Sequence, residues 1–111
     1  MTPGDVVRLP FPQADGLVKD RPAVLLCRLP PYGDWLLCGV STQLQREVRG
    51  FDEVIAPPDA DFRDSALRAP SLIRLGFLYV VPSVKLIGAI GSISPERHRR
   101  LLQNLAAHLL K

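Results

Sequence analysis

Residues 20–29 read Asp-Arg-Pro-Ala-Val-Leu-Leu-Cys-Arg-Leu, and residues 35–41 read Trp-Leu-Leu-Cys-Gly-Val-Ser. Each run is short, apolar and bounded by proline or glycine, a pattern that predicts β-strands over residues 23–29 and 35–41. Their apolar side chains do not alternate with polar ones, so both faces of each strand should be covered. In a small barrel one face points inward, and the other face needs a helix or a second copy of the chain.

Glycine and proline divide the rest of the chain into short segments, which indicates many brief strands rather than long helices. Further strands are predicted over residues 5–11, 53–55, 72–74 or slightly longer, and 86–92. Loops are predicted over residues 12–20, 30–34, 43–51 and 57–70.

One helix is predicted near the C-terminal end. Ser94 suits an N-cap, Pro95 suits the first helical position, and Glu96 places an acid in the first turn. An apolar stripe follows at Leu101, Leu102, Leu105, Ala106 and Leu109. The polar residues expected mostly on the solvent side are Arg97, Arg99, Arg100, Gln103 and Asn104.

These elements predict a mainly β (α+β) fold, a small and strongly bent antiparallel barrel with a C-terminal helix. One helix does not obviously cover every apolar face, so a homodimer is expected.

The composition is that of a single globular domain over residues 1–111, with 47% hydrophobic and 23% charged residues. The formal net charge is +3, and 11 of the 14 basic residues are arginine. Arginine favours bidentate contacts with phosphate or carboxylate. No apolar stretch approaches the roughly 20 residues needed to span a bilayer, and no secretory signal is recognised. We therefore expect a cytoplasmic protein in which Cys27 and Cys38 are buried thiols.

Several kinds of catalytic site are excluded by the sequence. It has no glycine-rich phosphate loop, no His-x-x-x-His and no Cys-x-x-Cys. His98 and His108 are about 15 Å apart along the predicted helix, too far to flank one phosphate. Carboxylates cluster at Asp52, Glu53, Asp59, Asp61 and Asp64. Because this cluster lacks a fixed ligand spacing, we interpret it as a solvated acidic loop, and expect no metal or cofactor.

The remaining candidates are Arg21, at the start of one predicted strand, and Ser41-Thr42-Gln43, at the end of the next. Arginine presents a fixed fork of donors and stays charged at any working pH, so it could share one phosphate with the two hydroxyls. On their own, these residues also fit an ordinary surface arginine and a turn in which hydroxyls bond nearby backbone.

Several segments, in their order along the chain, resemble the MazF/PemK family of toxins from bacterial toxin–antitoxin modules. They are Gly4-Asp5-Val6-Val7 with Pro10-Phe11, Arg21-Pro22-Ala23-Val24-Leu25, Cys38-Gly39-Val40-Ser41-Thr42-Gln43, Pro70-Ser71-Leu72-Ile73-Arg74-Leu75, and residues 86–96 before a leucine-rich helix. The resemblance covers nearly the whole chain, and the ordered set is specific although no single segment is.

The resemblance implies a dimeric SH3-like (CcdB/PemK-like) barrel and a metal-independent endoribonuclease that cuts single-stranded messenger RNA at short sequences. It also implies inhibition by a small MazE-like antitoxin whose disordered tail occupies the RNA groove. The family's reactive arginine falls on Arg21, and its strand-end threonine falls on Ser41, with Thr42 beside it. An acid often present in the family's first loop has no clear counterpart, because Gly16-Leu17-Val18 stands near that place.

By this resemblance, the ribose 2′-OH would attack its own phosphate, while Arg21 stabilises the charge on the phosphoryl oxygens. The Ser41 hydroxyl would orient the phosphate or the 2′-OH. Contacts with the bases and phosphates of the RNA are expected from Gln13, Asp15, Lys19, Thr42, Gln43, Arg46 and Arg74.

Two other functions stay open at this level. The same barrel family includes gyrase poisons, which bind a protein and cut no RNA. The serine at position 41 and the missing loop acid also fit an inactive paralogue that only binds nucleic acid. The combination of Arg21 with Ser41 and Thr42 favours the ribonuclease, since a pure protein binder has no reason to keep it.

Overall fold

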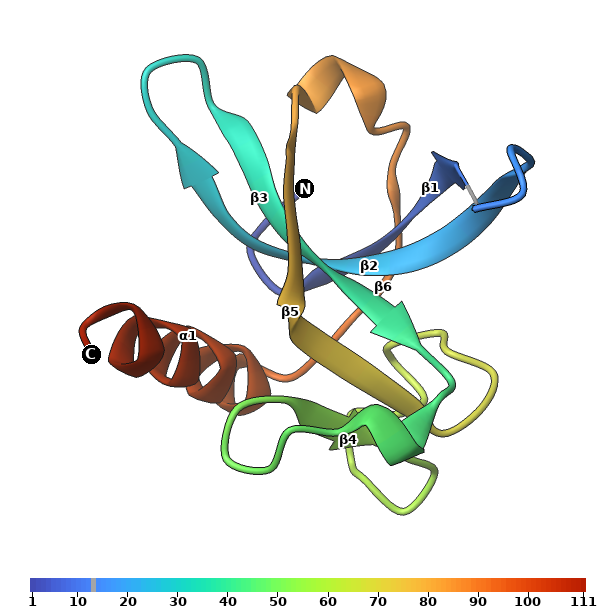
Figure 1. Ribbon diagram of the computed structural model, residues 1–111, viewed down its shortest axis with the longest axis vertical. Coiled ribbons are helices and arrows are strands. Elements are labelled where there is room, and N and C mark those ends of the chain that lie inside the picture. The colour runs from blue at the N-terminus through green and yellow to red at the C-terminus, as the bar shows by residue number, and fades with distance from the viewer. Residues whose placement is uncertain (13) are drawn as a thin grey trace.

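A computed structural model describes residues 1–12 and 14–111 of the chain. It has six strands and one α-helix, with a 3₁₀ turn after β3 and another after β5 (Figure 1). The strands are β1 (Asp5–Pro12), β2 (Val18–Leu29), β3 (Asp34–Ser41), β4 (Glu53–Ile55), β5 (Ser71–Val81) and β6 (Ala89–Ser92). The helices are η1 (Leu44–Arg46), η2 (Ser83–Lys85) and α1 (Pro95–Leu109).

The strands form one antiparallel sheet in the order β4-β5-β3-β2-β1-β6, curled into a half-barrel. The pairing register shifts between Leu25 and Cys27 of β2 and between Cys38 and Gly39 of β3. Such bulges add twist and bend the strands, which explains the curl. The expected mainly β, strongly bent antiparallel architecture with a C-terminal helix is confirmed at this level.

Both faces of the central strands are buried, as the sequence predicts. Val24 and Leu26 of β2 pack in one apolar cluster with Leu101 and Leu105 of α1. Successive side chains of a strand point to opposite faces, so Ala23 and Leu25 belong to the other face. There they join a second apolar cluster with further residues, Val7, Leu9, Trp35, Leu37 and Leu86. The helix therefore covers one face, and the curl of the sheet encloses the other.

The helix begins as predicted. Ser94 is its N-cap, because the Ser94 hydroxyl accepts a hydrogen bond from the backbone N–H of Arg97 at 3.1 Å, and Pro95 occupies the first turn. The predicted apolar stripe is only partly right. Leu101 and Leu105 are buried, but Ala106 is exposed and Leu109 is 69% exposed, because α1 runs past the edge of the sheet.

Three strand boundaries differ from the predictions by more than one residue. β2 starts at Val18 because residues 18–22 pair with β1, so the predicted loop over residues 12–20 is shorter. β5 continues to Val81, since its second half pairs again with β3. β6 covers only residues 89–92 of the predicted 86–92, because the chain before it forms η2 and an irregular link. No helix among the described residues is long and apolar enough to cross a membrane.

Candidate functional site

An open groove of about 650 Å³ lies where the N-terminal part of β2 and the end of β3 meet β5 and the turn after β1. We call it the basic groove. It is lined by Phe11, Ala14, Arg21, Pro22, Gly39, Val40, Ser41, Gln43, Arg46, Arg74 and Phe77. Five of the nine residues that the sequence singled out for catalysis or RNA binding are therefore brought together, namely Arg21, Ser41, Gln43, Arg46 and Arg74.

The strand pairing explains why Arg21 and Ser41 line the same groove. Ala23 of β2 and Gly39 of β3 are the last pair of this ladder, and Arg21 and Ser41 each lie two residues beyond it on their own strand. Because side chains alternate along a strand, Arg21 shares the face of Ala23, and Ser41 shares the face of Gly39. Residues opposite each other in an antiparallel pair share one face of the sheet. Here it is the face of the enclosed apolar cluster, so the basic groove continues that face beyond its apolar part. Both side chains are half-buried.

The Ser41 hydroxyl accepts a hydrogen bond from the backbone N–H of Gln43 at 3.1 Å. This is the local turn that the residue types alone suggest. The same bond directs the hydroxyl oxygen by using one of its lone pairs, and its O–H remains available as a donor. Ser41 thus offers a positioned donor in the same groove as Arg21.

Two more guanidinium groups line the basic groove. Arg74 pairs with Gly39 in the register of β5 with β3, and Arg46 ends the 3₁₀ turn η1. No carboxylate is among the described residues that line the groove. A cleft lined by charges of one sign focuses its field, so this one favours a polyanion.

The other described residues that were predicted to contact RNA do not line the basic groove. Lys19 is exposed on β2 and pairs with Phe11, which puts it on the same face as Arg21 at the flank of the basic groove. Thr42 is exposed at the strand end and does not line the groove. Asp15 is exposed and accepts a hydrogen bond from the backbone N–H of Leu17. Gln13 lies outside the described residues.

Sequence reasoning missed the aromatic side of this site. Phe11 and Phe77 line the basic groove, and Tyr79 contacts both rings. Burial raises the pKa of the Tyr79 hydroxyl, which has no hydrogen-bond partner among the described residues, so Tyr79 acts here as a neutral ring. The available signal was Gly-Phe-Leu-Tyr over residues 76–79, since aromatic residues two apart on a strand share a face.

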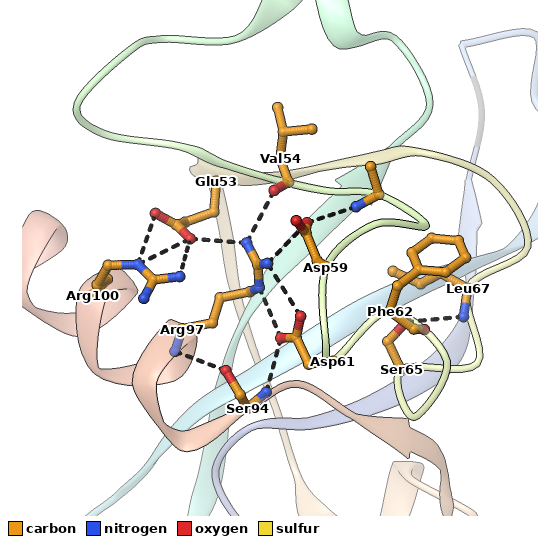
Figure 2. Close-up of polar contacts among 11 residues, drawn as sticks. Glu53, Val54, Asp59, Asp61, Phe62, Ser65, Leu67, Ser94, Arg97 and Arg100 are labelled. Carbon is orange, nitrogen blue, oxygen red and sulfur yellow. Dashed lines mark hydrogen bonds and ion pairs between the residues drawn. The ribbon is translucent and has the colours of Figure 1, made fainter.

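The interpretation of the carboxylates as a solvated loop holds for the exposed Asp64 but is wrong for Asp52, Glu53, Asp59 and Asp61. The expectation that Arg97 faces solvent is wrong too. Figure 2 shows the Arg97 guanidinium enclosed by Glu53, Asp59 and Asp61, with Arg100 reaching Glu53 from outside. Arg97 Nε donates to Asp61 Oδ2 at 2.8 Å, and Arg97 Nη1 donates to Glu53 Oε1 at 2.9 Å. Its remaining donors reach Val54 O, Asp59 Oδ2 and Asp61 Oδ1 at 3.0–3.1 Å. All five donors of a guanidinium are thus used.

The cluster around Arg97 keeps the Asp61 carboxyl ionised. Burial by itself would raise the pKa of the Asp61 carboxyl, but hydrogen bonds from Arg97 and from the backbone of Ser94 outweigh it and hold the pKa at about 2. The described residues contain no group of three or more His, Cys, Asp or Glu side chains placed to hold a metal ion.

Asp52 is a further buried acid, and it binds the backbone next to the groove residue Arg74. Asp52 accepts hydrogen bonds from the backbone N–H of Val48 at 2.9 Å and of Leu75 at 3.0 Å. Leu75 follows Arg74 at the point where β5 leaves its pairing with β3. Asp52 therefore satisfies a backbone donor that the interruption of the ladder exposes, next to a groove residue.

Neither histidine and neither cysteine lines the basic groove. His98 Nε2 lies 2.8 Å from the carbonyl oxygen of Leu26, and the His108 ring lies 5.1 Å from the ring of Phe51. These contacts attach α1 to the rest of the protein. Cys38 is buried, and burial raises the pKa of its thiol to about 12, so it stays protonated, whereas Cys27 is half-buried.

No protein-family model matches the chain, and no curated protein matches it either. The chemistry of the basic groove therefore has to be argued from its own residues.

Proposed function

We propose that this protein is a toxin of a type II toxin–antitoxin module, a MazF/PemK-like endoribonuclease that cleaves single-stranded messenger RNA in the cytoplasm. The observation that carries the proposal is that Arg21 and Ser41 line one groove with two further arginines and no described carboxylate. The ordered sequence resemblance supports it, and so does a curled sheet with a C-terminal helix, which fits an SH3-like barrel of the CcdB/PemK kind.

The phosphate backbone of the RNA occupies the basic groove. Arg46 and Arg74 hold phosphates beside the cut site, which leaves Arg21 and Ser41 for the scissile phosphate. Lys19, Thr42 and Gln43 lie around the groove, where they contact the strand as it enters or leaves. An open groove accepts a single strand more readily than a closed pocket would, because its bases can be splayed out.

The chemical step is attack of a ribose 2′-OH on the adjacent phosphorus. A new P–O2′ bond forms, the P–O5′ bond breaks, and the products end in a 2′,3′-cyclic phosphate and a 5′-OH. The 2′-OH proton passes to water, and the leaving 5′ oxygen takes a proton from water. The Arg21 guanidinium donates to the non-bridging oxygens, where negative charge develops, and the Ser41 hydroxyl donates to the same phosphate.

The arrangement predicts a slow enzyme. Arg21 is a poor general base at neutral pH because the pKa of an arginine exceeds about 12, and neither histidine lines the groove. Without a dedicated base, the rate gain of roughly 10²–10⁴ from general acid–base catalysis is incomplete. Orientation of the RNA and electrostatic stabilisation supply the rest.

Two partners belong to the proposal. A small MazE-like antitoxin with an acidic segment would block the basic groove by charge complementarity. A second copy of the chain would cover the exposed apolar side chains Val80, Val84 and Ile87, which follow one another along β5, η2 and the link after η2. Sedimentation velocity at micromolar concentration distinguishes the dimer from a monomer.

The test is cleavage of a long single-stranded RNA in EDTA by wild type, Arg21→Ala, Ser41→Ala and the control Arg99→Ala, an exposed arginine on α1. We expect discrete cuts with 2′,3′-cyclic phosphate ends, a loss of roughly 10²–10³-fold in rate for Arg21→Ala, and about tenfold for Ser41→Ala. Arg99→Ala should cut like wild type.

Arg21→Ala within a few-fold of wild type would overturn the assignment of Arg21. Intact RNA from folded wild type across varied substrates would overturn the nuclease and point to a gyrase-poison-like protein binder or an inactive nucleic-acid-binding barrel.

A further inference from the structure

An aromatic cluster forms one wall of the basic groove. The ring centroids of Phe11 and Tyr79 are 4.7 Å apart, those of Phe77 and Tyr79 are 5.6 Å apart, and those of Phe11 and Phe77 are 5.8 Å apart. All three pairs are edge-to-face, the arrangement that aromatic quadrupoles favour. Each ring is therefore held in its orientation by the other two.

Phe77 stands out because it is 45% exposed although it is packed in this cluster. Its position comes from an interruption of the sheet: Gly39 of β3 pairs with Arg74, but the preceding Cys38 pairs with Leu78. Residues 75–77 are thus extra on β5, and the strand bends there (Figure 1).

Gly39 makes room for the Phe77 ring. A Cβ atom at position 39 would lie only 3.3 Å from both Cγ and Cδ1 of Phe77. The ring thus rests directly on the backbone of β3, two residues before Ser41. A large apolar surface is held rigidly open to solvent beside three guanidinium groups.

We propose that Phe77 is a stacking platform for one unpaired base of the RNA, adjacent to the phosphate that Arg21 binds. This inference rests on the proposed function. A nucleic acid single strand is the ligand that needs both surfaces at once, because its bases stack on aromatic rings while its phosphates pair with cations. Phe77 takes no part in bond breaking. It selects the position of the strand and favours cutting next to a base that stacks well.

The experiment measures binding of RNA oligonucleotides that carry the mapped cut sequence and a single 2′-deoxyribose at the cut, which removes the attacking hydroxyl. Each base around the cut is replaced in turn by an abasic site, and affinity is measured by fluorescence anisotropy. The proteins are wild type, Phe77→Leu, Phe77→Trp and the control Tyr32→Leu. Tyr32 is an aromatic residue that is 84% exposed and does not line the groove.

We expect one abasic position beside the cut to weaken binding by wild type about 5- to 150-fold. Phe77→Leu should lose a similar factor with the complete RNA and lose little more with that abasic RNA. Tyr32→Leu should match wild type. Phe77→Trp should keep its affinity, and its added fluorescence should be quenched on binding, since the native Trp35 is fully buried.

Three results would overturn the platform. An unchanged affinity of Phe77→Leu with a flat abasic scan, alongside Arg21-dependent cutting, would refute it and leave the nuclease standing. An equal loss with complete and abasic RNA would mean that Phe77 only shapes the groove. Wild type that binds no RNA would overturn both proposals.

Discussion

Arg97 and Arg21 carry the same guanidinium in opposite surroundings. Arg97 is buried, and each of its five donors meets an oxygen of Glu53, Val54, Asp59 or Asp61 (Figure 2). Arg21 lines an open groove with Arg46 and Arg74, where no described carboxylate is present. The first guanidinium is saturated by the protein and serves the fold, whereas the groove guanidiniums face a space that suits an external anion.

The difference teaches that residue type sets what an arginine is able to do, and that the surrounding acids set what it does. The acids around Arg97 lie 36–44 positions earlier in the chain, and β4 and the loop after it bring them onto the first turn of α1. Three carboxylates around one buried cation are a stable arrangement only when hydrogen bonds are complete.

The largest effect on stability is expected from breaking the buried arrangement. Arg97→Ala should lower the free energy of unfolding by about 3–5 kcal/mol, because it leaves three carboxylates facing one another without their cation. Arg99→Ala, two residues away and exposed, should stay within about 0.5 kcal/mol of wild type. Denaturant unfolding measures both. A loss below about 1 kcal/mol for Arg97→Ala would mean that the cluster relaxes into solvent, contrary to this comparison.

Acid should weaken the same arrangement. The pKa of Asp61 is about 2 in the folded protein and about 3.8 when the chain is unfolded, so the unfolded state takes up the proton first as pH falls. Stability from this group is therefore complete above about pH 5 and declines as pH falls toward about 2, by about 2 kcal/mol in total.

Unfolding curves between about pH 5 and pH 2 would measure this effect. Asp61→Asn should remove that part of the pH dependence, whereas Asp64→Asn, a neighbouring exposed carboxyl, should leave it in place. If the pH dependence of Asp61→Asn matches that of wild type, the assignment to Asp61 is wrong.

The smallest of these effects is expected from Arg46 and Arg74 of the basic groove, and it appears in the salt dependence of RNA binding. Arg46→Ala and Arg74→Ala should each lower the slope of log affinity against log salt by about 0.7, as expected for one phosphate contact on a single strand. Neither should change the free energy of unfolding by more than about 0.5 kcal/mol. Arg68→Ala, exposed and outside the groove, is the matched control. An unchanged slope for Arg46→Ala and Arg74→Ala would remove them from the RNA path.

Local signals in the sequence were sufficient for much of the fold. The start of α1 at Ser94 and Pro95 follows from capping chemistry, which depends only on residues three or four apart. The two-sided burial of β2 and β3 follows from their unbroken apolar runs. The length of β5 did not follow, because residues 75–77 interrupt its pairing with β3 and hide the strand period.

The candidate site likewise contains residues that the sequence predicted and residues that it did not. The residue types, the expected pairing of two consecutive strands and the order of the motifs single out Arg21 and Ser41 from the sequence, since adjacent antiparallel strands bring the first part of one strand next to the end of the other. The exposure of Phe77 could not be predicted in this way. It depends on the register shift between β3 and β5 and on the contact of the Phe77 ring with the backbone of Gly39, and both involve residues far apart in the sequence.

By itself the sequence determined the strands, the capped helix and the chemical character of each side chain, because these depend on neighbours along the chain. Only the tertiary structure decided that Arg97 is saturated by three acids while Arg21, Arg46 and Arg74 share an open groove. The physical reason is that the environment of a charge is set by groups far away in sequence, and those distances exist only after folding.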